Sequence, residues 1–131
     1  MRYNLNQQPL IKTTLPVEAF NELVLDSIQE IKGKRIVKLD LRAIDDTPTD
    51  FFFICEGESN TQVKAIASNI RKRIKEETGM LPAHVEGVQT AQWVLVDYFN
   101  VVIHIFHPEK RAFYDLENLW SDADFTEYDS I

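Results

Sequence analysis

The chain has 131 residues, of which 44% are hydrophobic and only 4 are glycine and 5 are proline. This composition is enough to bury one sizeable core and predicts a single globular domain. The formal net charge of -7 argues against a general nucleic-acid coat protein, since phosphate contacts need clustered cations, and it favours a partner with a basic surface.

The N-terminal segment, residues 1–15, is mostly polar and shows no hydrophobic period, so we expect a flexible arm. It lacks the apolar core of a signal peptide, and nowhere in the chain do 18 apolar residues follow one another. Cys55 is the single cysteine, which excludes an internal disulfide and indicates a reducing compartment, with burial as a small hydrophobe its simplest role. We therefore expect a cytoplasmic protein with no membrane contact.

The segment between Pro16 and Gly33 is predicted to be a helix. Apolar residues recur there at helical spacing, proline suits the first turn of a helix, and glycine ends one. Two strands are expected next. Residues 35–41 alternate in part between apolar and polar side chains, whereas the continuous apolar run of residues 51–55 is typical of a strand that is buried on both faces.

A second helix is expected after a turn at Gly57. Ser59 or Asn60 can cap its start, and Gly79 can end it. Its exposed positions are rich in basic residues, which leaves open an RNA-binding face beside the more ordinary explanation of a solvated helix surface. These basic residues are Lys64, Arg71, Lys72, Arg73 and Lys75.

The densest apolar run, residues 91–107, predicts a β-hairpin that follows a short strand within residues 81–86. The hairpin strands are residues 93–96 and 101–106, and we expect the turn between them to place Asn100 at a positive φ.

The hairpin has two faces, because side chains alternate along a strand. Trp93 and Asp97 share one face of the first strand, and Tyr98 lies on the other. The second strand is apolar on both faces except at His104, so we expect it to lie in the centre of the sheet.

The C-terminal part is predicted to contain one more helix, residues 108–120, followed by an acidic and frayed tail, residues 121–131. The order of elements is helix, strand, strand, helix, three strands, helix. It predicts an α/β (α+β) fold with a mixed sheet of about five strands and flanking helices.

No motif predicts a catalytic residue, a metal or a cofactor. The three histidines and one cysteine lack the short spacing of zinc ligands, and there is no P-loop or dinucleotide fingerprint. The turn from Gly57 to Ser59 resembles the glycine-serine turn of nucleotidyltransferases, but the following strands lack the carboxylate pair that would hold magnesium ions. A nucleotidyltransferase-fold enzyme or nucleotide-binding protein that uses this turn is the alternative function.

A binding surface accounts better for the large amphipathic side chains near the hairpin. Trp93, Asp97, Tyr98 and Tyr114 combine aromatic area with a carboxylate, as the centres of protein interfaces do. From composition alone, Trp93 and Tyr114 fit a core equally well.

Several segments occur in a specific order and spacing: IVKLDLR at 36–42, DFFFIC at 50–55, GES at 57–59, HVEG at 84–87, WVLVDY at 93–98, VVIHIF at 101–106 and FYDLENLW at 113–120. Together they resemble the bacterial ribosomal silencing factor family RsfS, also called the Iojap family. The resemblance covers residues 20 to 120, within an expected domain of residues 16–120. The chain departs from the family pattern at Phe99-Asn100, where family members usually have Gly-Asp in the turn.

The resemblance implies a nucleotidyltransferase-like fold without catalytic carboxylates and a protein that is not an enzyme. It implies a translation repressor that binds the large ribosomal subunit at the ribosomal protein of the L-fourteen family and sterically blocks joining of the small subunit when nutrients are scarce. Contact with ribosomal RNA would be incidental, and a homodimer is left open.

The resemblance also implies which residues bind the partner. They are Trp93, Asp97, Tyr98, Val101 and His104. Trp93 and Tyr98 would supply buried area, and Asp97 would pair with a cation of the basic ribosomal protein.

Overall fold

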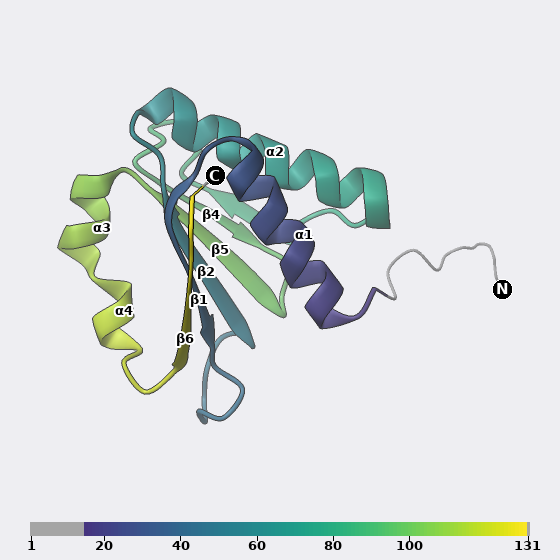
Figure 1. Ribbon diagram of the computed structural model, residues 1–131, viewed down its shortest axis with the longest axis vertical. Coiled ribbons are helices and arrows are strands. Elements are labelled where there is room, and N and C mark those ends of the chain that lie inside the picture. Colours follow the sequence, from purple (N-terminus) through teal and green to yellow (C-terminus); the bar gives the residue numbers. More distant parts are fainter. Residues whose placement is uncertain (1–14, 131) are drawn as a thin grey trace, which may run out of the picture.

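The computed structural model describes residues 15–130, so the arm expected for residues 1–15 lies outside the described residues except for its last position. No helix in the described part is long and apolar enough to cross a membrane. The elements follow the chain as α1 (Val17–Glu30), β1 (Lys34–Asp40), β2 (Phe51–Glu56), α2 (Asn60–Thr78), β3 (His84–Glu86), β4 (Trp93–Asp97), β5 (Val101–Phe106), α3 (Pro108–Tyr114), α4 (Leu116–Leu119) and β6 (Asp124–Tyr128) (Figure 1).

The sheet has six strands in the order β3-β4-β5-β2-β1-β6. The β2–β5 pair is parallel and the other pairs are antiparallel. Every residue of β5 is buried, because β4 and β2 flank it and both faces of the sheet are covered there. The predicted α/β class, the mixed sheet, the hairpin and the central position of its second strand are thus confirmed, while the number of strands is six instead of about five.

The sixth strand corrects the expectation that the end of the chain frays. Residues 124–128 form β6, which pairs with β1 so that Leu39 lies opposite Phe125 and Val37 opposite Glu127. Most of β6 is exposed, since it is an edge strand held by backbone hydrogen bonds to one neighbour. An edge strand needs little apolar alternation, and for this reason the acidic composition concealed it.

The helix predicted for residues 108–120 is also corrected. It is interrupted at Asp115, whose φ of 49° is left-handed, so that α3 and α4 are separate short helices. By contrast, Ser59 caps α2 as predicted, its Oγ accepting a hydrogen bond from the Gln62 amide at 3.1 Å, and Gly79 ends α2 at a φ of 79°.

Gly33 follows α1 for a reason other than the one predicted. The left-handed residue after α1 is Lys32, with a φ of 63°, and not the glycine. A Cβ atom on Gly33 would lie 2.3 Å from Cγ2 of Ile28, so glycine is needed there for close packing of the chain against the helix.

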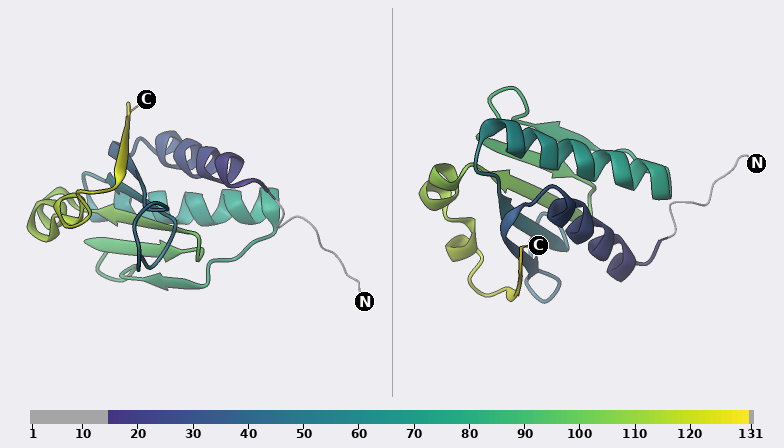
Figure 2. Two further views of the ribbon diagram at one scale, coloured as in Figure 1. Left: turned by 90° about the horizontal axis from the view of Figure 1, so that it is seen from below. Right: turned by 45° about the horizontal axis from the view of Figure 1, so that its top comes forward.

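Two clusters of apolar side chains cover the two faces of the sheet. The helix face packs against α1 and α2, and Val94, Val96 and Tyr98 point into it. The opposite face, hereafter the second face, carries Trp93 and Leu95. Both views in Figure 2 show α1 and α2 together on one side of the sheet and α3 and α4 at its end. The second face is therefore covered less completely than the helix face.

The single cysteine lies in the helix-face core. Cys55 is fully buried, and burial raises the pKa of its thiol to about 12. The side chain is therefore a neutral packing group, as expected from its position in an apolar strand.

Candidate functional site

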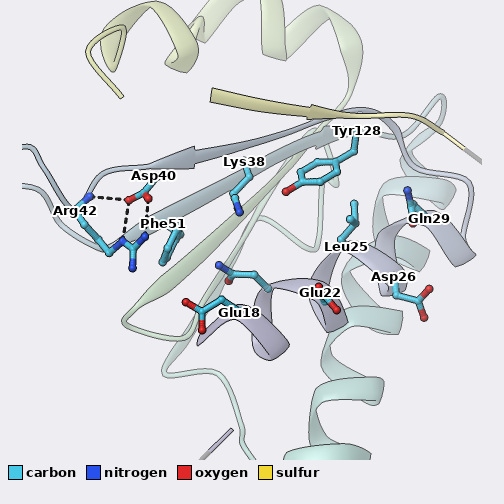
Figure 3. A pocket seen from close by; sticks show the side chains of 11 residues that line it. Glu18, Glu22, Leu25, Asp26, Gln29, Lys38, Asp40, Arg42, Phe51 and Tyr128 are labelled. Carbon is cyan, nitrogen blue, oxygen red and sulfur yellow. Dashed lines mark hydrogen bonds and ion pairs between the residues drawn. The ribbon is translucent and has the colours of Figure 1, made fainter. Parts of the chain in front are cut away.

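A groove of about 540 Å³ runs between α1 and the β1–β6 side of the sheet. Figure 3 shows the side chain of Lys38 pointing from β1 into this groove, toward α1. The charged groups at its far end are paired with each other: Arg42 donates to both carboxylate oxygens of Asp40, at 3.0 and 2.8 Å. These hydrogen bonds lower the pKa of Asp40. Across residues 15–130, no group of three or more His, Cys, Asp or Glu side chains is placed to hold a metal ion.

The turn from Gly57 to Ser59 uses its hydrogen-bond donors internally. The Gly57 amide donates to the Phe106 carbonyl at 3.0 Å, and the Glu58 amide donates to Oε1 of Gln62 at 2.6 Å. A Cβ atom on Gly57 would lie 2.8 Å from the Val63 amide nitrogen. The glycine is therefore explained by the close approach of β2 to the start of α2, and these two amides are not free to hold a phosphate.

One basic residue of α2, Arg73, is paired with neighbouring acids. Arg73 lies 2.5 Å from Asp26 and 3.1 Å from Glu77, and Glu30 is also within salt-bridge distance. The paired Arg73 ties α2 to α1. The ordinary explanation, a solvated helix face, accounts for this residue without a nucleic acid.

The five residues expected at the partner interface do not lie on one surface. Trp93, Asp97 and His104 belong to the second face, whereas Tyr98 and Val101 are buried in the helix-face core. The rings of Tyr98 and Phe20 pack in a T-shaped arrangement with their centroids 5.4 Å apart, and burial raises the pKa of the Tyr98 hydroxyl to about 12. The structure thus brings Trp93, Asp97 and His104 together and separates the other two from them.

The hairpin turn differs from the prediction in its left-handed residue. Phe99, with a φ of 71°, adopts that conformation instead of Asn100. A bulky residue is strained there, and two hydrogen bonds hold it: the Phe99 amide donates to Oδ1 of Asp97 at 2.7 Å, and the Thr49 hydroxyl donates to the Phe99 carbonyl at 2.6 Å. Asp97 therefore has a structural role in the turn as well as a partly exposed carboxylate.

The second face carries an aromatic patch, which consists of Trp93, Leu95, Phe113 and Tyr114. The Trp93 and Tyr114 ring centroids are 4.5 Å apart, and those of Phe113 and Tyr114 are 5.1 Å apart. Phe113 is 75% exposed and Tyr114 44% exposed, so α3 extends the partly buried apolar surface of β4 into solvent. A cluster of this kind is typical of an interaction site.

The sequence analysis did not identify Phe113 as an exposed residue of the candidate site. The available signal was the pair Phe113-Tyr114, because two consecutive residues of a helix point about 100° apart and cannot share a narrow buried stripe.

His104 lies directly beneath the patch. It is 4% exposed, and its Nδ1 accepts a hydrogen bond from Nε1 of Trp93 at 3.1 Å. Its ring packs edge to face on Phe52, with the centroids 4.8 Å apart. Burial lowers the pKa of His104 to about 4, so the imidazole is neutral at neutral pH.

The low pKa of His104 predicts a specific pH dependence of stability. Between its ordinary pKa of 6.5 and about 4, the unfolded chain binds a proton at this residue and the folded chain does not, so the free energy of unfolding falls as the pH falls. Over the whole interval this contribution amounts to about 3 kcal/mol. Urea unfolding at pH 7 and pH 4.5 should show a larger loss for the wild type than for His104→Phe, and equal losses would contradict the assignment.

Comparisons with known proteins assign a family. A family model described as ribosomal silencing factor during starvation, RsfS, matches residues 16–131, which includes β6. The chain is 38% identical over 110 residues to the ribosomal silencing factor RsfS of Halalkalibacterium halodurans, covering 84% of this chain and 92% of that protein. It is 41% identical over 98 residues to the protein of the same name from Bacillus subtilis, covering 75% and 81%. A crystal structure of a Chromobacterium violaceum protein is similar at a TM-score of 0.77 and 34% identity, covering 82% and 88%.

Proposed function

Because the chain belongs to the RsfS family of ribosomal silencing factors, we propose that it binds the large ribosomal subunit at the ribosomal protein of the L-fourteen family. In this position it blocks association with the small subunit and represses translation when nutrients are limiting. Members of the family are regulators and not enzymes, so the proposed mechanism is steric occlusion.

The aromatic patch is the observation that carries the proposal. It offers a partly buried tryptophan and exposed aromatic rings from β4 and α3, the side chains that most often contribute the binding energy of a protein interface. A specific complex needs about 800 Å² of buried surface on each partner. The patch would form the centre of such an area, and the polar residues around it would form the rim.

The acidic character of the chain supports a basic partner. The net charge of -7 favours association with a cationic ribosomal protein and accelerates it at low salt. On the second face, the register places Asp97 two residues along β4 from Leu95. The turn uses Oδ1 of this carboxylate, and no side chain within residues 15–130 forms an ion pair with it, so Oδ2 is available to a cation of the partner.

Three further statements belong to the proposal. The protein acts in the cytoplasm, where the ribosomal subunits are. The basic residues of α2 other than Arg73 make at most incidental contact with ribosomal RNA. Sedimentation of the free protein tests for a homodimer, because a second copy of the chain would bury the same apolar patch.

Light scattering of separated subunits tests the proposal. The wild-type protein should reduce the joining of large and small subunits, and Asp97→Lys should weaken binding to the large subunit by about tenfold, since it places like charges together. Asp97→Asn keeps the oxygen that accepts from the Phe99 amide and removes only the charge, so it should have a smaller effect in the same direction.

Glu22→Lys is the matched control, because it changes the net charge equally but lies on α1 beside the groove. It should bind like the wild type. If the wild-type protein leaves subunit joining unchanged, the proposed function is wrong. If Glu22→Lys and Asp97→Lys weaken binding equally, overall charge explains the effect and the second face is not the interface.

A further inference from the structure

His104 occupies a position where packing alone would favour an apolar side chain. It lies in the central strand between Leu95 of β4 and Ile54 of β2, and the rings of Phe52, Trp93 and Phe106 surround it. A buried imidazole in such a site must satisfy its polar atoms or lose stability. We therefore look for a role of this imidazole that a phenyl ring could not fill.

The hydrogen bond from Trp93 identifies this role. Because the indole Nε1–H can only donate, Nδ1 of His104 must be the unprotonated nitrogen, and the proton of the neutral ring lies on Nε2. Within residues 15–130, Nε2 has no hydrogen-bond partner and is shielded from solvent. The fold therefore leaves one polar atom of His104 unsatisfied and uses the other to bind the indole.

We propose that His104 is a positioning residue for Trp93: it holds the indole in one orientation on the second face, ready for the partner. This inference rests on the proposed function. It also revises the sequence-based expectation for His104, which was direct contact with the ribosomal protein. A side chain that is 4% exposed acts on the partner only through Trp93.

The physical consequence is preorganisation of the interface. Phe106 and Tyr114 confine the Trp93 ring, with centroids 5.1 and 4.5 Å away, but aromatic packing alone does not select a single pair of χ1 and χ2 angles for the indole. The directional hydrogen bond to His104 removes that freedom before binding. Immobilising a side chain on binding costs an amount that corresponds to about twofold to tenfold in Kd.

Two substitutions of His104 separate positioning from packing. His104→Phe keeps an aromatic ring in the core and removes the acceptor. His104→Asn places an amide oxygen near the position of Nδ1, so it restores the acceptor with a smaller side chain. We expect His104→Phe to raise the Kd for large ribosomal subunits by about five- to tenfold and His104→Asn to recover most of this loss, although it fills the core less well.

The exchange rate of the Trp93 indole N–H, measured by NMR, provides a readout that does not depend on the ribosome. Trp120→Phe removes the second indole signal and assigns the first. We expect slow exchange in the wild type, fast exchange in His104→Phe and intermediate exchange in His104→Asn. In a Trp93→Phe background, which has no indole donor, His104→Phe should produce no further loss of affinity.

Unchanged indole exchange in folded His104→Phe would overturn the inference, and so would an equal loss of affinity in the Trp93→Phe background. If the wild-type protein does not bind large subunits at all, the proposed function fails and the binding role of the hydrogen bond fails with it. Slow indole exchange would then show only that the bond exists in the free protein.

Discussion

Replacing Arg111 with alanine is expected to lower the free energy of unfolding by about 3–5 kcal/mol. Arg111 on α3 and Glu56 at the end of β2 are 4% and 5% exposed, and Nη1 of Arg111 lies 3.2 Å from Oε2 of Glu56. The same nitrogen donates to the Arg35 carbonyl at 2.6 Å, and Nη2 donates to Glu117 of α4 at 2.6 Å. Alanine would leave the Glu56 carboxylate buried with one exposed arginine as its partner, and urea unfolding at pH 7 would measure the loss.

Arg42→Ala is the matched control, because Arg42 also makes two hydrogen bonds to one carboxylate but its side chain is 52% exposed. We expect a much smaller loss there, since water replaces an exposed ion pair at little cost. The double variant Arg111→Met with Glu56→Leu removes both buried charges and should recover most of the stability. The structure indicates that the buried network stabilises the packing of α3 on the sheet. Similar losses of unfolding free energy in Arg111→Ala and Arg42→Ala would contradict this.

The sequence was sufficient to predict most of the fold, because its strongest signals are local. Continuous apolar runs in β2 and β5 require burial on both faces, and the caps of α2 are set by Ser59 and Gly79. β6 lacked such a signal, since its pairing with β1 depends on backbone groups and not on side chains. The break at Asp115 was missed because one left-handed residue leaves the apolar spacing of the segment nearly intact.

The candidate site was predicted less completely, because periodicity assigns faces and not neighbours. It placed Trp93 and Asp97 on one face correctly, but it could not show that Tyr98 packs under α1 or that His104 lies beneath Trp93. The Arg111–Glu56 pair is 55 residues apart in the sequence, and neither residue has a pattern that reveals its partner. Contacts of this range depend on the arrangement of the sheet and its end helices.

Trp93→Ala is expected to raise the Kd for the large ribosomal subunit by at least about thirtyfold, which corresponds to about 2 kcal/mol or more. The indole forms the centre of the aromatic patch: it packs on Phe106, contacts Tyr114 and donates to His104. Its removal would leave a hollow in the proposed interface and an unpaired imidazole nitrogen. Binding is measured by cosedimentation with large subunits over a range of protein concentrations, and circular dichroism establishes that the variant is folded.

Phe99→Gly is the control that distinguishes the patch from the hairpin tip. Phe99 is 74% exposed, so the substitution removes an aromatic surface at the tip, while glycine adopts the observed φ of 71° without strain. We expect Phe99→Gly to bind like the wild type and to gain up to about 1 kcal/mol of stability from the relief of backbone strain. If Phe99→Gly loses affinity and Trp93→Ala does not, the partner contacts the tip of the hairpin. The interface would then exclude the second face, and the exposed aromatic rings of α3 would need another explanation.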